Sequence, residues 1–163
     1  MSLLRDVRMR VEALAPFRGD NQKIEVTGPE GTVRCEISAV DSLGVALRSL
    51  HIEPAAKLID AKLTLKARTE KLCGKVSYLL EPLALIELDP MRGQAMIRSK
   101  KPRTKEDDIV YYELMANANG STSIQRVVFN KSAKQRNSID VVVTPEQFEM
   151  LVEDLLFAAR SEN

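Results

Sequence analysis

Residues 22–40 read QKIEVTGPEGTVRCEISAV, and they carry the strongest indication of the architecture. Apolar and polar side chains alternate on both sides of the central Gly28-Pro29-Glu30-Gly31. A period of two residues is typical of a strand that buries one face, and glycine and proline mark a turn. The segment therefore predicts a β-hairpin.

Similar patterns predict more strands further along the chain. A third strand is expected at 45–52, and the alternation at 59–66 predicts a strand that pairs with 72–80 across a turn at 69–71. Residues 79–88 are apolar on both alternating faces. We expect that strand to be covered on both sides, by the terminal helices or by a subunit interface.

A second hairpin is expected in the last third of the chain. Residues 109–116 and 124–129 flank Asn119-Gly120, a pair that favours the positive φ angles of a tight turn. A loop at 130–137 then leads to a strand at 139–143.

Helices are expected at both ends. Apolar residues recur at three- and four-residue intervals from Leu3 to Leu14, which predicts an amphipathic helix that Pro16 ends. Thr144-Pro145-Glu146-Gln147 has the features of a capping box and precedes an apolar stripe that reaches Ala159.

The expected fold is α+β and mainly antiparallel, a strand-rich barrel or half-barrel with N-terminal and C-terminal helices. We divide the chain into an amphipathic helix (1–17), a barrel-like domain (18–98), a polar linker (99–108) and a hairpin-strand-helix unit (109–163). The last unit is either separate or part of the same domain.

Few side chains are suited to catalysis. The 163 residues include one histidine, His51, two cysteines and no tryptophan. GxSxG, HExxH, P-loop and GxGxxG motifs are absent, and Cys35 and Cys73 lack the spacing of metal ligands. We expect no enzyme activity, no metal and no cofactor. The first residues suggest neither a signal peptide nor a membrane span, so a cytoplasmic protein without membrane insertion is expected.

The charge is unevenly distributed. The formal net charge is +1, yet residues 92–136 hold ten basic and four acidic side chains. Basic residues gather in loops 99–105 and 131–136, and one tyrosine of the adjacent hairpin should face outward, where a base could stack on it. The residues expected to contact a nucleic acid are Lys100, Lys101, Arg103, Lys105, Lys131, Lys134 and Arg136, with Tyr111 and Tyr112 beside them. The element order of 109–160 is also loosely similar to the repeat of Pur-type single-strand-binding proteins.

One resemblance covers more of the chain. The turn Ala39-Val40-Asp41-Ser42-Leu43-Gly44 is followed by Val45-Ala46-Leu47, and then by Leu63-Thr64-Leu65 and Gly74–Tyr78. On these segments, residues 18–98 resemble a PilZ-type barrel. The resemblance implies a six-stranded barrel, which in that family binds cyclic di-GMP through an RxxxR segment and a DxSxxG turn.

This chain departs from both motifs. Arg18 is followed by Gln22 where the second arginine is expected, Ala39 and Asp41 replace aspartate and serine, and Gly44 agrees. Guanidinium groups grip phosphates, whereas a carboxylate at position 41 repels them. We therefore expect a PilZ-like barrel that does not bind cyclic di-GMP.

Together these features predict a non-catalytic binding module. Its partner is expected to be another protein chain or a second copy, bound through the N-terminal helix and the apolar strand. Binding of single-stranded nucleic acid by the basic loops is the alternative. The expected interface residues are Leu79, Leu83, Leu85, Ile86 and Leu88.

Overall fold

The computed structural model describes residues 2–160. Met1 and residues 161–163, which belong to the first and last expected units, lie outside the described residues. The elements in chain order are α1 (Ser2–Glu12), β1 (Phe17–Gly28), β2 (Gly31–Val40), β3 (Val45–Pro54), the short 3-10 helix η1 (Ala56–Leu58), α2 (Leu65–Lys75), β4 (Leu83–Asp89), β5 (Gln94–Ser99), β6 (Arg103–Lys105), β7 (Asp108–Asn117), β8 (Thr122–Asn130), β9 (Gln135–Ile139), β10 (Val141–Val143) and α3 (Pro145–Phe157).

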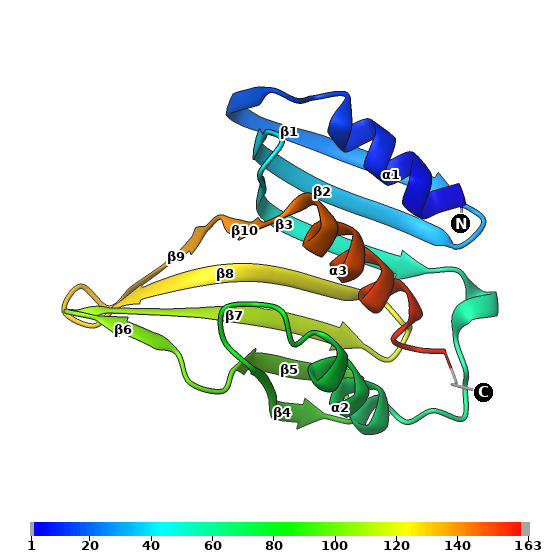
Figure 1. Ribbon diagram of the computed structural model, residues 1–163. Coiled ribbons are helices and arrows are strands. Elements are labelled where there is room, and N and C mark those ends of the chain that lie inside the picture. The colour runs from blue at the N-terminus through cyan, green and yellow to red at the C-terminus, as the bar shows by residue number, and fades with distance from the viewer. Residues whose placement is uncertain (1, 161–163) are drawn as a thin grey trace.

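The strands of residues 2–160 form one sheet in which every pairing is antiparallel (Figure 1). Its main path runs β1-β2-β3-β8-β7-β5-β4, while β10 pairs with β3, β6 with β7, and β9 with β8. The α+β class, the mainly antiparallel sheet and the two terminal helices are thus confirmed. The sheet is not closed, because β1 and β4 lie at its two ends.

The hairpin of β7 and β8 has different neighbours along its length. Near the turn at 117–121, β7 pairs with β5 and β8 with β3. Toward the opposite end, β7 pairs with β6 and β8 with β9. We call this second part, residues 100–112 and 126–139, the distal lobe.

The α-helices α1, α2 and α3 cover the same face of the sheet (Figure 1). α1 packs on β1 and β2, α3 on β3 and β10, and α2 on β4, β5 and β7. Leu3, Val7 and Val11 of α1 are buried in this core together with Leu151 and Leu155 of α3. The apolar stripe of the N-terminal helix is therefore used within the chain, which leaves little of it for a partner.

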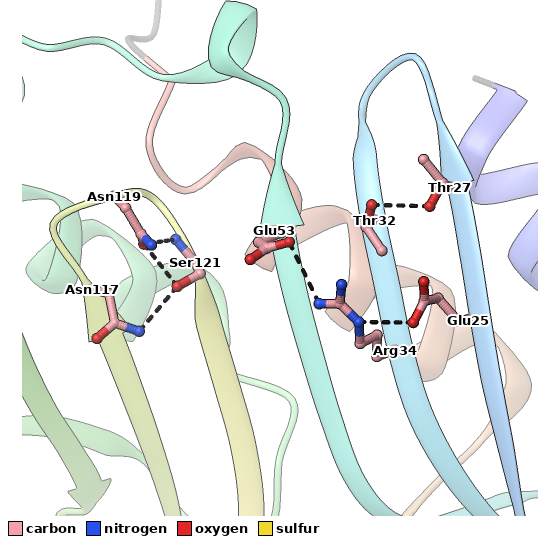
Figure 2. A network of polar contacts seen from close by, with 8 residues as sticks. All are labelled: Glu25, Thr27, Thr32, Arg34, Glu53, Asn117, Asn119 and Ser121. Carbon is pink, nitrogen blue, oxygen red and sulfur yellow. Dashed lines mark hydrogen bonds and ion pairs between the residues drawn. The ribbon is translucent and has the colours of Figure 1, made fainter.

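The other face of β1, β2 and β3 carries a network of polar side chains. Arg34 of β2 donates to Glu25 of β1 at 2.9 Å and to Glu53 of β3 at 3.4 Å, which Figure 2 shows across the three strands. Cross-strand ion pairs of this kind stabilise neighbouring strands on a face that is exposed to solvent and has no covering layer.

The strands expected at 59–66 and 72–80 are wrong. Residues 59–64 form a loop, and α2 begins at Leu65 because the Thr64 hydroxyl accepts the Ala67 N–H at 3.1 Å as an N-cap. Leu65, Leu72 and Val76 also recur at helical spacing, and Leu72 and Val76 are fully buried. An alternation over a few residues did not distinguish this loop and helix start from a strand.

The prediction that 79–88 is apolar on both faces is wrong as well. The strand starts at Leu83, and its register with β5 shifts between Leu85 and Glu87. This bulge puts Leu88 on the same face as Leu83 and Leu85, toward α2, and leaves Ile86 outside the alternation. The other face carries Ala84 and Glu87.

The expected linker and last strand also differ in detail. Residues 103–105 of the linker form β6, and the strands on either side of the linker in sequence, β5 and β7, pair directly with each other. Residues 109–160 therefore continue the same sheet. The strand expected at 139–143 is divided into β9 and β10, and β9 begins within the loop expected at 130–137.

Candidate binding site

A cleft opens on the helix-covered side where the end of α1, the β2–β3 turn and the start of α3 meet. Its volume is about 590 Å³. Val11, Val40, Val45 and Phe148 contribute apolar walls, each side chain being buried. A hollow of this size accommodates a small ligand or several side chains of a bound polypeptide.

The rim of this α1–α3 cleft is charged. Arg8, Glu12, Asp41 and Glu149 line it, so three carboxylates face one guanidinium. Arg8 Nε lies 3.6 Å from Glu149 Oε1, and Asp41 Oδ1 accepts two backbone N–H groups of its turn at 2.7 and 2.9 Å. The excess of carboxylates favours a ligand that carries positive charge beside an apolar part.

A second hollow of about 490 Å³ shares Asp41 with the cleft. Arg18, Ala39 and Gly44 also line it, so four of the five positions compared with the PilZ motifs meet there, and Gln22 does not. Arg18 and Asp41 therefore line the same hollow.

The two basic segments meet at one end of the sheet. The Lys131 N–H donates to the Asp107 carbonyl at 2.8 Å, and Ser132 Oγ donates to the Asp107 carboxylate at 2.5 Å. These bonds join the β6–β7 turn to the β8–β9 turn. Six exposed basic side chains of this region make no ion pair within residues 2–160: Lys100, Lys101, Arg103, Lys105, Lys131 and Lys134.

Arg136, the seventh expected contact, is engaged within the chain. Its guanidinium donates to the Glu113 carboxylate at 2.5 and 2.9 Å, and Arg98 Nε donates to the same carboxylate at 3.0 Å. Burial alone would raise the pKa of Glu113, but the hydrogen bonds and charges of Arg136 and Arg98 lower it below its ordinary value. Glu113 therefore stays ionised and neutralises part of the basic charge.

The two tyrosines face opposite sides, as their alternation predicts. Tyr112 is buried toward the helices, with the Arg126 guanidinium 4.1 Å from its ring centroid. Tyr111 is half-buried on the uncovered face, where the Arg98 guanidinium lies 5.4 Å from its ring centroid and Arg136 donates to its hydroxyl at 3.3 Å. Guanidinium groups therefore already contact the more exposed tyrosine.

One buried polar network escaped the sequence analysis. Arg126 Nη1 and Nη2 donate to the two carboxylate oxygens of Glu81 at 2.9 and 3.0 Å, and both side chains are less than a tenth exposed. Ser99 Oγ donates to Glu81 at 3.0 Å and accepts the Tyr112 N–H at 2.8 Å. The network attaches the loop after α2 to the sheet. Glu81 lies within an apolar run, 45 positions from Arg126, so no local sequence pattern predicts that the two residues form an ion pair.

The expected interface residues lie at the β4 end of the sheet. Leu83 is buried, Leu79, Leu85 and Leu88 are half-buried, and Ile86 is 54% exposed. The outer edge of β4 has no partner strand within residues 2–160. A short strand with a bulge is, however, a feature that hinders edge-to-edge pairing.

The reactive side chains are dispersed. Burial raises the pKa of the Cys35 thiol to about 12, so that thiol stays protonated at neutral pH. His51 is half-buried on β3 and lines a shallow hollow with Arg34 and Ser49. No group of three or more potential metal ligands occurs in residues 2–160. Within the same residues, no helix combines the length and apolar character needed to cross a bilayer.

Comparisons with known proteins found no match. No family model matches this sequence, and neither a curated protein nor a solved structure is significantly similar to it.

Sequence reasoning found only part of the cleft. Its walls come from the two ends of the chain, around Val11 and Phe148, and from the turn that starts at Asp41. The helical stripes of both ends identify Val11 and Phe148 as buried residues. Nothing in the sequence specifies that the two helices meet beside this turn.

Proposed function

We propose that this chain is a non-catalytic binding module that holds an apolar, basic segment of another polypeptide in the α1–α3 cleft. The observation that carries the proposal is the combination of buried apolar walls with a rim of Glu12, Asp41 and Glu149. Apolar walls contribute affinity by removing ligand surface from water, and the acidic rim selects for positive charge.

Neighbouring side chains support the same location. Leu43, at the tip of the β2–β3 turn next to the cleft, is 82% exposed. Large apolar side chains that remain in water near a cleft extend the surface available to a partner. The first turn of α3 adds Glu146, which increases the negative charge on this side.

The test uses peptides selected from a phage-displayed random library on the full chain, with affinity measured by fluorescence anisotropy. Ala15 is exposed and lines the cleft, so Ala15→Trp should fill the space and lower affinity at least about tenfold. Ala13→Trp, at an exposed position outside the cleft, is the matched control. Equal binding by the wild type and Ala15→Trp would overturn the proposal.

The charge of the rim is tested in the same assay. Glu12→Lys should weaken binding of the selected peptides, and the loss should shrink at high salt because exposed charges are screened. Glu70→Lys, at an exposed position on α2, makes the same charge change away from the cleft and should leave affinity unchanged.

Binding of single-stranded nucleic acid by the distal lobe is a second candidate. The bonds from Lys131 and Ser132 to Asp107 favour it, because they bring the two basic segments together. It predicts salt-sensitive retention of single-stranded oligonucleotides, which alanine at Lys100, Lys101, Lys131 and Lys134 weakens. Lack of retention at low salt removes this candidate.

Other expectations stay predictions. They are the PilZ-like resemblance, the lack of catalysis, the cytoplasmic location and a second copy as the partner. Light scattering over a range of concentrations tests the last of these, since a strict monomer at high concentration contradicts it.

A further inference from the structure

Arg68 is a buried cation without a counter-charge. Its side chain belongs to the first half of α2, and the residue is 4% exposed. Nη2 donates to the Asn117 carbonyl, while Nε has no hydrogen-bond partner. No carboxylate of residues 2–160 pairs with it, and burial lowers its pKa.

The other buried charged residues of the described chain are compensated. Glu81 binds Arg126, and Glu113 binds two guanidiniums. Glu30 accepts from Ser2 Oγ and the Leu3 N–H. A buried cation that lacks such a partner is strongly unfavourable, so Arg68 is the exception that needs an explanation.

A second orphan group lies at the same end of the β7–β8 hairpin. Thr122 is fully buried, and its Oγ1 has no hydrogen-bond partner. Thr122 pairs with Ala116, the residue before Asn117, and alternates with the half-buried Ser123. Its side chain therefore lies on the helix-covered face of the sheet, the face on which α2 places Arg68.

Several hydrogen bonds connect the residues of the turn between these strands. Asn117 Nδ2 donates to Ser121 Oγ at 3.0 Å, and Ser121 donates from its N–H and its hydroxyl to Asn119 Oδ1 at 2.9 and 2.8 Å, as Figure 2 shows. The Asn117 N–H also donates to the Ser121 carbonyl at 2.9 Å. The turn satisfies its own polar side chains, so it leaves none to compensate Arg68.

A small anion would compensate the buried charge of Arg68. An oxyanion can accept from a guanidinium N–H and from a hydroxyl at the same time, which matches the unused donors Arg68 Nε and Thr122 Oγ1. The low exposure of both residues and the cover of Ile59 over Gly120 exclude a bulky ligand: a Cβ at Gly120 would lie 2.7 Å from Ile59 Cδ1. We propose that Arg68 and Thr122 form a binding site for a small oxyanion, a carboxylate or phosphate, between α2 and the β7–β8 turn.

The test is thermal unfolding of the full chain in formate, acetate or phosphate, against chloride at equal ionic strength. At saturation, at least one oxyanion should raise the midpoint of the wild type by about 3 °C or more. The anion that raises the midpoint shows whether the site takes a carboxylate or a phosphate, and the concentration that gives half of the maximal rise gives the affinity. Absence of any saturable, oxyanion-specific rise would overturn the proposal.

Variants separate binding from general salt effects. Arg68→Met should lose the oxyanion-dependent rise and, in chloride, melt no lower than the wild type, because the uncompensated charge is removed. Arg103→Met, at an exposed position, is the matched control and should retain the rise. An equal rise in Arg68→Met would show a nonspecific effect and refute the site.

Thr122 gives a test that does not depend on Arg68. Thr122→Val removes the hydroxyl at nearly constant volume and should raise the half-effect concentration about tenfold, whereas Thr122→Ser should keep it close to that of the wild type. If both variants behave like the wild type, Thr122 is not part of the site as proposed.

Discussion

The buried pair Glu81–Arg126 permits a sharp prediction about stability. Its two hydrogen bonds are 2.9 and 3.0 Å long, and the side chains are 8% and 6% exposed. Glu81→Gln removes the negative charge and leaves the Arg126 cation buried. Breaking a buried pair from one side costs about 3–5 kcal/mol, which corresponds to a fall of roughly 10 °C in the unfolding midpoint of a chain of this size.

Urea unfolding of three variants tests this reasoning. The double variant Glu81→Met with Arg126→Met leaves no uncompensated charge, so it should be much more stable than Glu81→Gln. Arg34→Met breaks two exposed pairs, with Glu25 and Glu53, and should cost no more than about 1 kcal/mol. A loss of under about 1 kcal/mol in Glu81→Gln, or a double variant no more stable than Glu81→Gln, would refute the assignment of the pair as a buried unit.

Three further predictions concern stability, each measured by urea unfolding. Gly74→Ala should stabilise the protein by up to about 1 kcal/mol, because a Cβ at this position of α2 meets open space. Gly31→Ala should destabilise it strongly, because the φ of Gly31 is +143° and a Cβ would lie 2.2 Å from the Glu53 carbonyl oxygen. If Gly31→Ala were the more stable of the two variants, the backbone described here would be contradicted. Thr64→Ala should cost about 1 kcal/mol through loss of the α2 cap, and a neutral result would argue against a helix starting there. The paired guanidiniums lower the pKa of Glu113 despite its burial. The stability that Glu113 contributes is therefore present above its unfolded pKa and is lost as the pH falls through its lower folded pKa. Glu113→Gln should flatten the decrease of the unfolding free energy with falling pH, and an unchanged decrease would count against the pairing.

The antiparallel sheet could be predicted from sequence because alternation over long segments specifies one buried face. The hairpin at 22–40 and the capping box at Thr144 are examples, and both are confirmed. Alternation was not sufficient where one extra residue changes the register, as at Ile86, because a bulge reverses the face to which every later side chain of the strand points. It also failed at 59–66, where the cap at Thr64 outweighs a short alternation.

The candidate site was less predictable than the fold. The α1–α3 cleft depends on how three segments far apart in the chain meet, which no local pattern encodes. The basic loops were found because their charge is local, and the bond from Lys131 to Asp107 joins their ends. Their partial neutralisation by Glu113 was not foreseen, since it requires the register of β7 with β5 and the reach of Arg136 from β9.

Hydrogen exchange of the full chain with and without a selected peptide examines the proposed function most directly. We predict added protection confined to the last turn of α1, the turn at 41–44 and the first turns of α3. Protection that instead appears in the distal lobe or along β4, with these three segments unchanged, would contradict it.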